Sequence, residues 1–334
     1  MTEDATTDGQ SRPATTNSRR ARASVNGLLA VVFVVLVAIA AAGLWLRHEE
    51  VLADASSNAE KLTGILSEHL AIRFDTIDET LYQLAQHSRM IGGPEASGME
   101  WMPTLSMAVA GRYAIESVIV TNADGTATFS SLPMNMGDSW EGGHLFNQLS
   151  ADPTDDALVT DAPTRSLDNG RMVVPVGRVL RTVNSEFEGM LIATLAPERL
   201  REFYASVDVG ENGVISILHP QNQIVFRHPA DNKLIGEALP IIPVPSEATE
   251  GGAQGVVSGP LESGGPTYLT AYRTSEKTGL TVTVSLVQGA LLAAWWYDVY
   301  VALGFALLVG LILIGVSIMV SRALKSRDAV VEAN

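Results

Sequence analysis

The chain has 334 residues with 22 Lys and Arg against 37 Asp and Glu, so its formal net charge is −15, which excludes broad binding to nucleic-acid phosphates. It contains no Cys, which excludes disulfide frameworks, thiolate metal sites and cysteine nucleophiles.

The mean hydropathy of +0.18, in a chain with 18% charged residues, indicates that the apolar residues are gathered in a few stretches. The first stretch runs from Gly27 to Leu46 without a charge, and about 20 helical residues match the thickness of a bilayer core. It is longer than the apolar region of a signal peptide, so we predict an uncleaved transmembrane anchor. Residues 1–26 before it are rich in Thr, Ser, Ala and Arg, and are predicted to be a disordered tail.

A second uncharged stretch, Val299–Val320, predicts a second transmembrane helix, followed by a short tail at 321–334. Basic residues flank the outer end of each stretch, so the positive-inside rule places both termini in the cytoplasm and residues 47–298 on the other side of the membrane. This loop holds 15 basic and 32 acidic residues, a formal charge of −17.

Directly after the first stretch, apolar residues recur every three or four positions from Leu62 to Leu84. This spacing predicts a long amphipathic helix over about His48–His87, which a Gly-Gly-Pro sequence at 92–94 ends. A second, shorter helix is predicted around Met99–Tyr113. Because the apolar stripe continues for several turns, we expect a parallel homodimer along the long helix.

The rest of the loop has the pattern of β-strands separated by turns. An Asp-Gly turn at Asn122–Gly125 predicts a β-hairpin, and a helix is predicted at Ala196–Val207. Strands are predicted at Ile115–Val120, Thr126–Ser131, Arg171–Leu180, Glu188–Leu195, Gly213–His219, Gln223–His228, Thr267–Arg273 and Leu280–Val287. Helix followed by antiparallel strands thus occurs twice, which predicts an α+β fold of two modules on the long helix, at about residues 90–200 and 201–290.

Motifs of catalysis are absent from the sequence. It has no HExxH, P-loop, GxGxxG, GxSxG or EF-hand motif, and no two of its six His are at metal-ligand spacing. An acidic turn, Asp152–Asp156, is expected to be solvated rather than to hold a cation. We therefore expect a protein that is not an enzyme and that has no cofactor and no metal site.

Two segments, Glu188–Pro229 and Tyr268–Val287, together resemble a known family. They contain a helix ending in Phe-Tyr, an Asp-x-Gly, a Gly-x-Ile strand, a hairpin end with Arg and then Pro, and an Ala-Tyr-Arg strand. The matching residues are Phe203, Tyr204, Asp208, Gly210, Gly213, Ile215, Arg227, Pro229 and Ala271–Arg273. This combination, over about residues 47–298, resembles the extracytoplasmic double-Cache (PDC-type) sensor domains of bacterial histidine kinases and diguanylate cyclases.

The resemblance implies two tandem PAS-like modules in the periplasm, anchored in the bacterial inner membrane, with a small organic ligand bound in the distal module. Members of the family commonly have an Asp-Arg-x-Tyr-Phe segment in that module. The matching stretch here is Gly142–Phe146, and only Phe146 agrees, which makes it one candidate ligand contact. The Trp-Tyr signature of amino-acid-binding members is absent, so an amino-acid ligand is not implied.

Arg178 matches the arginine of the family's later strand, and Arg171 opens the same strand. Each is a candidate for binding a ligand carboxylate, because a guanidinium makes a bidentate pair with it, and each has the alternative of being an exposed strand residue. Trp140 and His144 are candidate walls of the same pocket, with packing as their alternative. Arg73, on the long helix beside the apolar stripe, faces either a pocket or water.

The sequence therefore predicts a two-pass membrane sensor that binds a small ligand, an organic acid being one class. Residues 321–334 are too few for an output domain, so the signal is expected to pass to a kinase or cyclase in trans, or to a domain of a longer receptor. The alternative is an envelope scaffold in which the Cache fold has a degenerate pocket and binds no ligand.

Overall fold

The structure is a computed structural model that describes residues 15–110, 115–132, 136–166, 170–231, 233–238 and 252–332. The chain divides into two compact units. One consists of Met1–Leu52 together with Leu292–Asn334, and the other consists of Ala53–Leu291.

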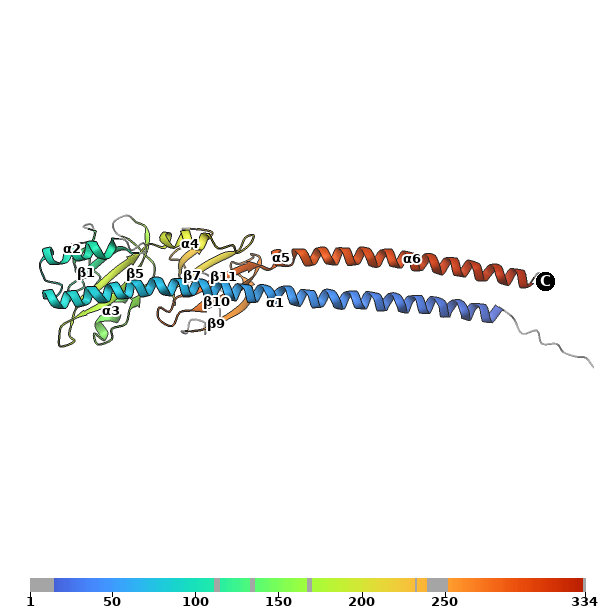
Figure 1. The fold of residues 1–334 in the computed structure, drawn as a ribbon, viewed down its shortest axis with the longest axis horizontal. Helices are drawn as coiled ribbons and strands as arrows, with labels where there is room; N and C mark the ends of the chain where they lie inside the picture. Colours follow the sequence, from blue (N-terminus) through green and yellow to red (C-terminus); the bar gives the residue numbers. More distant parts are fainter. Residues whose placement is uncertain are drawn as a thin grey trace, which may run out of the picture. The chain divides into compact units, whose positions relative to one another are not determined.

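Two apolar helices form the described part of the first unit. They are the N-terminal part of α1 (Thr15–Ile91) and α6 (Ala293–Glu332) (Figure 1). Within the segments Ser24–Ile91 and Ala293–Ala323, each helix is long and apolar enough to cross a membrane. The predicted spans lie inside these segments, and their large apolar side chains are mostly exposed, as residues that face lipid are.

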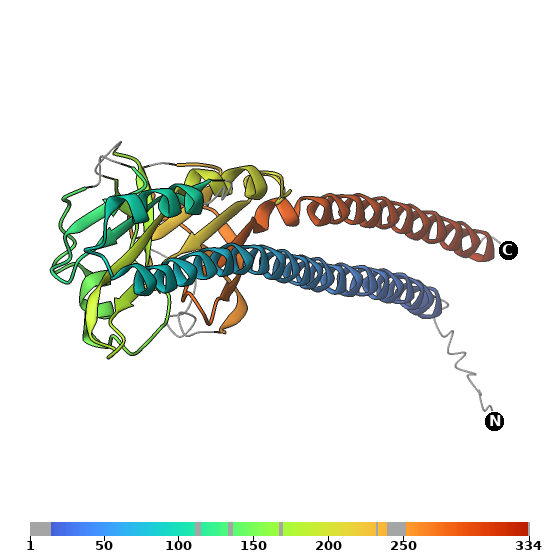
Figure 2. The same ribbon diagram turned by 60° about the vertical axis from the view of Figure 1, so that its left-hand side comes forward.

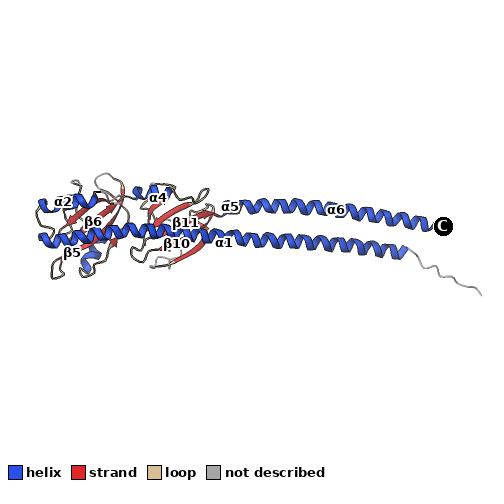
Figure 3. Ribbon diagram, in the orientation of Figure 1, coloured by secondary structure: helices blue, strands red, loops and turns tan. Residues whose placement is uncertain are grey.

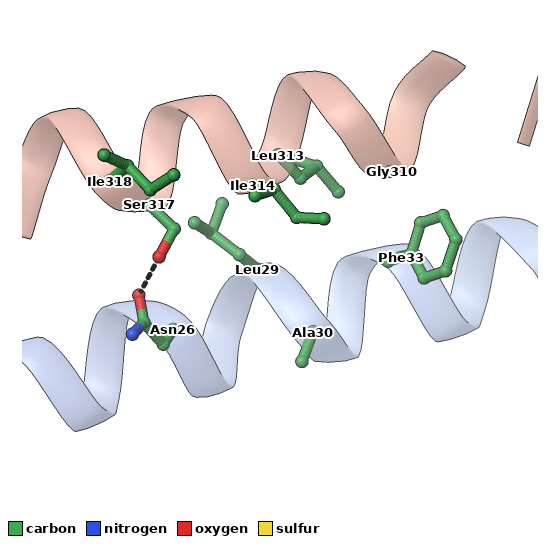
Figure 4. Close-up of a pocket in the computed structure, with 9 residues that line it drawn as sticks. All are labelled: Asn26, Leu29, Ala30, Phe33, Gly310, Leu313, Ile314, Ser317 and Ile318. Atoms are coloured by element: carbon green, nitrogen blue, oxygen red, sulfur yellow. Dashed lines mark hydrogen bonds between the residues drawn. The ribbon is translucent and has the colours of Figure 1, made fainter. Parts of the chain in front are cut away.

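Polar contacts join the two helices of this unit. Arg47 Nη1 lies 3.4 Å from Asp298 Oδ2, and the indole Nε1 of Trp295 donates to the carbonyl of Leu44 at 2.8 Å. In the apolar stretch, the hydroxyl of Ser317 donates to Asn26 Oδ1 at 2.8 Å beside a groove lined mainly by Leu, Ile, Phe and Ala (Figure 4). An interhelical hydrogen bond in lipid satisfies polar groups that have no water to bind.

The second unit begins with the rest of α1 and a distal module, which holds a six-stranded antiparallel sheet. Its elements are α2 (Gly98–Val109), β1 (Ile115–Thr121), β2 (Ala127–Ser130), α3 (His144–Ala151), β3 (Val159–Thr160), β4 (Thr164–Arg165), β5 (Met172–Arg181) and β6 (Phe187–Leu195). The strand order is β2-β1-β6-β5-β3, with β4 also paired to β5. A complete capping box, formed by Ser97 and Glu100, starts α2.

The proximal module holds a five-stranded antiparallel sheet (Figure 3). Its elements are a 3-10 turn (Pro197–Leu200), α4 (Arg201–Ala205), β7 (Val214–Leu218), β8 (Ile224–His228), β9 (Gln254–Pro260), β10 (Thr267–Thr274), β11 (Thr281–Val287) and α5 (Gln288–Leu291). The order β8-β7-β11-β10-β9 repeats that of the distal sheet, strand for strand. The predicted α+β fold with two modules is confirmed.

One apolar core runs along α1 and includes side chains of both sheets. The helix contributes the stripe that the sequence spacing predicts, Leu66, Leu70, Phe74, Ile77, Leu81 and Leu84, each at most 3% exposed. Burial of one such side chain contributes about 1.5–3 kcal/mol. Trp101 anchors α2 beside the end of α1 (Figure 2), since its Nε1 donates to the carbonyl of Gly93 at 3.1 Å.

A second, smaller core covers the other face of the distal sheet. It consists of Ile119, Ala127, Leu145, Leu149, Val159, Val179, Met190 and Ile192. Two of these, Leu145 and Leu149, come from α3, so this short helix closes the face that α1 does not reach. The distal sheet is therefore buried on both faces.

Some predicted elements differ from the observed ones. α2 ends at Val109, and Tyr113, the predicted end, lies outside the described residues. The predicted helix Ala196–Val207 is instead a 3-10 turn and the five residues of α4. α3 and the edge strand β9 are present although the sequence analysis predicted neither.

Candidate functional site

A cleft of about 190 Å³ opens on the face of the distal sheet that is turned away from α1. The sheet supplies its floor through Ile119, Val173 and Thr194. The walls come from the segment before α3 and from β4. The complete lining is Ile119, Asp138, Ser139, Trp140, Thr164, Arg165, Ser166, Val173 and Thr194.

The cleft offers hydrogen-bond donors around an apolar floor. The side chain of Arg165 is exposed and donates one long bond, 3.3 Å from Nη1 to the carbonyl of Gly170. The Nε1 of Trp140 is buried and has no partner among the described residues. Burial raises the pKa of Asp138 above its ordinary value. These groups suit an anion with an apolar part, because a cation and an indole line the same cleft as aliphatic side chains.

The main chain holds Trp140 in the cleft wall. Its backbone N–H donates to the carbonyl of Gly125 at 2.9 Å, and its own carbonyl accepts from Gly143 at 3.2 Å. Gly125 has φ of +79° and lies in the β1–β2 turn, where a Cβ would meet the ring of Phe146 at 3.0 Å. The turn that the sequence predicts as a hairpin therefore also positions the wall of the cleft.

Arg178 lies on the opposite face of the sheet from the cleft. Successive strand residues point to opposite faces, and Arg178 shares its face with Val174, Val176 and Leu180, which pack in the core of α1. Its guanidinium pairs with Asp78 of α1, lies 2.9 Å from Asp156 and stands 5.4 Å from the ring centroid of Tyr82. The predicted shared pocket of Arg178 and Trp140 is therefore not formed.

Asp78 is the centre of a charge network that joins both modules to α1. Its second oxygen accepts from Lys277 of the proximal module at 2.8 Å, and Lys277 also pairs with Asp75 at 2.6 Å. Burial alone would raise the pKa of Asp78, but the hydrogen bonds from Lys277 and Arg178 outweigh it and hold the pKa below its ordinary value. Hydrogen bonds to Asp75 and Asp78 raise the pKa of Lys277.

The acidic turn belongs to the same network. Asp156 pairs with Arg178 and lies 3.8 Å from Arg181 Nη2, while the guanidinium of Arg181 also donates to the carbonyls of Pro153 and Thr154. The turn thus uses Asp156 in ion pairs within the distal module.

The other predicted site residues are dispersed. His144 begins α3, half exposed, with Nδ1 at 3.5 Å from Asp161. Phe146 packs edge-on against Phe187 at 5.6 Å. Arg171 is exposed at the start of β5, next to the cleft, and Arg73 is exposed on α1.

Of the six predicted residues, only Trp140 lines the cleft. The sequence analysis missed Arg165, Asp138 and the hydroxyls of Ser139, Thr164 and Ser166. One signal was available in the sequence, because a Thr-Arg-Ser triplet precedes an Asp-Asn-Gly sequence, which is typical of turns, and then the strand β5. Among the described residues, no group of three His, Asp or Glu could hold a metal ion.

The unit resembles solved sensory domains. The extracellular domain of a protein described as the histidine kinase rpHK1S-Z16 matches 73% of this chain and 99% of its own, with a TM-score of 0.60 and 25% identity. The periplasmic sensory domain of the Campylobacter jejuni chemoreceptor Tlp1 matches 73% and 98%, with a TM-score of 0.58 and 10% identity.

The ligand-binding domain of the Pseudomonas fluorescens chemoreceptor CtaA, in a complex with L-isoleucine, matches 74% of this chain and 98% of its own, with a TM-score of 0.55 and 10% identity. No protein-family model and no curated protein matches the chain. The double-Cache resemblance predicted from the sequence is confirmed at the level of the fold. These neighbours are sensory domains rather than catalytic ones.

Proposed function

We propose that this protein is a two-pass sensor of the bacterial inner membrane, with both termini in the cytoplasm, and that the distal cleft binds a small organic acid. The observation that carries the proposal is the cleft itself, which brings Arg165 and Trp140, whose buried indole N–H has no partner among the described residues, beside Ile119 and Val173. The sensory fold, the two apolar helices and the basic residues at their outer ends support the location.

In this proposal the ligand carboxylate pairs with Arg165 and accepts from Trp140, while its carbon atoms contact Ile119 and Val173. Asp138, whose pKa burial raises, contributes a further polar contact at the rim. Arg171, at the start of β5, is near Arg165 in the chain and can contribute a second positive charge to binding. The other four predicted residues are not assigned to the site. His144 pairs with Asp161, Phe146 packs on Phe187, Arg178 pairs with Asp78, and Arg73 is exposed on α1. The signal then passes through the membrane helices to a kinase or cyclase.

The ligand is tested by thermal unfolding of the full chain in nanodiscs against acetate, lactate, succinate and benzoate. A compound at 100 times its Kd adds about 2.7 kcal/mol of stability. We expect Arg165→Ala to weaken the binding of the best compound at least tenfold. Arg73→Ala, which removes an exposed guanidinium far from the cleft, is the matched control and keeps the binding.

Binding that survives Arg165→Ala would contradict the proposed site. The absence of binding by any of these acids and a wider metabolite library would favour the scaffold alternative instead.

We propose further that two copies associate through an exposed apolar surface on α1. Ile65 and Ile72, one heptad apart, are 61% and 56% exposed. They flank His69, which stacks on Phe203 with ring centroids 3.6 Å apart, and the hollow there has Lys61 and Glu68 at its edge. A second copy would remove the two isoleucine side chains from water.

We expect the double variant Ile65→Asp, Ile72→Asp to be monomeric in detergent where the unchanged chain is dimeric, as measured by light scattering on a sizing column. Glu79→Lys, one heptad beyond Ile72 and exposed, is the charge-changing control. A dimer that persists in the double variant would place the interface elsewhere.

A further inference from the structure

The proximal sheet has a buried hydroxyl-bearing surface on the face turned away from α1. In the β7–β11 ladder, Ser216 lies opposite Thr283, and in the β10–β11 ladder Thr270 lies opposite Ser285 and Thr274 opposite Thr281. Directly opposed residues point to the same side of a sheet. The hydroxyl surface consists of Ser216, Thr270, Thr274, Thr281, Thr283 and Ser285, each at most 4% exposed.

The alternate residues of the same strands show that the two faces differ in chemistry. Ile215, Ile217, Ala271, Val282 and Val284 all lie in the core of α1. The distal sheet has the same strand order, and its corresponding outer face combines apolar residues, Ile119, Val179, Met190 and Ile192, with the buried hydroxyls of Ser117, Thr121 and Thr194. The hydroxyl surface is thus the more polar of the two outer faces, and what distinguishes the proximal module is the charged residue beside it.

Arg227 of β8 points to the same face, because it lies opposite Ser216 in the β7–β8 ladder. Its side chain is 11% exposed. Its Nη1 is buried and has no hydrogen-bond partner among the residues that the structure describes. Its Nη2 lies 3.7 Å from an oxygen of Glu262, which is too long for a hydrogen bond, and the side chain of Glu262 is 63% exposed.

A buried guanidinium without close acceptors is strongly unfavourable, because its charge and its N–H groups have left water. The hydroxyl opposite Arg227 in the ladder is that of Ser216, whereas the hydroxyls on β10 and β11 bond one another, Thr270 with Ser285 at 2.9 Å and Thr274 with Thr281 at 2.8 Å. An oxyanion would satisfy the guanidinium with two parallel bonds, and hydroxyls can rotate to donate to it.

We propose that the proximal module holds a second site, in which Arg227 binds a small oxyanion, a carboxylate or phosphate, at the edge of the hydroxyl surface. Glu262 is the internal competitor for this guanidinium, and the anion displaces it. The site is separate from the distal cleft, and the proposal does not depend on the ligand proposed for that cleft.

The test uses the full chain in nanodiscs, titrated with sodium acetate and, separately, sodium phosphate at constant ionic strength, with the thermal midpoint as readout. We expect at least one anion to raise the midpoint saturably, and Arg227→Gln to weaken this binding at least tenfold. Both titrations are made in the Arg165→Ala background, so that binding in the distal cleft does not contribute to the shift.

Glu262→Gln gives a second readout that does not depend on the stability of the Arg227 variant. Removing the competing carboxylate is expected to tighten anion binding several-fold, whereas a purely structural Arg227–Glu262 pair predicts no tightening. The proposal is overturned if neither anion acts saturably in the Arg165→Ala background, if Arg227→Gln folds and binds as before, or if Glu262→Gln does not tighten binding.

Discussion

Asp78→Asn is expected to lower the free energy of unfolding of the full chain by about 3 kcal/mol at neutral pH. The substitution leaves the guanidinium of Arg178 buried, with a side chain only 6% exposed, and with Asp156 as its remaining carboxylate partner. We choose the lower end of the range for broken buried pairs because the side chain of Asp78 is itself 18% exposed. Denaturant titration followed by tryptophan fluorescence measures the change.

The effect of Asp78→Asn depends on pH in a defined direction. The folded-state pKa of Asp78 is lowered, so its ionised form stabilises the protein above the ordinary aspartate pKa of about 3.9, and this contribution is lost as the pH falls through the lower folded-state value. The difference between the unchanged chain and the variant should therefore shrink below about pH 4. A difference that grows on acidification would contradict the assigned network.

Two further variants distinguish the effect of losing the ion pair from nonspecific destabilisation of α1. Glu79→Gln alters the next residue of α1, which is exposed and accepts only a local bond from Gln83 at 2.8 Å, so we expect a change within about 0.5 kcal/mol. The double variant Asp78→Asn, Arg178→Met should lose less stability than the two single variants summed, because no charge is left buried without its partner.

Tyr204→Ala is expected to cost about 3–5 kcal/mol, the second large effect. Tyr204 is fully buried where α4 meets α1 and the proximal sheet, and its ring lies 5.2 Å from that of Phe226 and 5.5 Å from that of Phe203. Its hydroxyl donates to the carbonyl of Leu66 at 3.2 Å, and burial raises its pKa. The same denaturant titration measures the loss.

Tyr204→Phe keeps the ring and removes only the hydroxyl, so we expect a loss of about 1 kcal/mol. The large difference between the two variants would identify ring burial as the main contribution. Equal losses would mean that the hydrogen bond from Tyr204 to Leu66, and not the packing of the ring, holds α4 against α1.

The strands and helices with strong periodicity could be predicted from the sequence, and the short polar ones could not. The stripe of α1 and the β-branched runs of β1 and β11 have one clear period each. β9, with the sequence QGVVSGP, lies at a sheet edge and has Gly and Pro where other strands have apolar residues. α3 has only eight residues and starts after two glycines, so no helical pattern stands out.

The candidate site was harder to predict than the fold, and β5 shows why. The strand is apolar on both faces, so alternation does not tell which face meets α1, and Arg178 could be placed in a pocket as readily as against the helix. Its partner Asp78 lies 100 residues earlier in the chain. Only the tertiary structure brings them together and assigns the cleft to Trp140 and Arg165 instead.

The place of α1 in the one core that both modules share has a consequence for synthesis. Leu66 and the turns around it precede the distal module in the chain, yet Tyr204 and the proximal sheet, which cover them, are made after it. At about 5–20 residues per second, the roughly 200 residues between Leu66 and the last proximal strands take about 10–40 s to translate. During that interval the proximal part of the helix is an apolar surface that its own sheet does not yet cover.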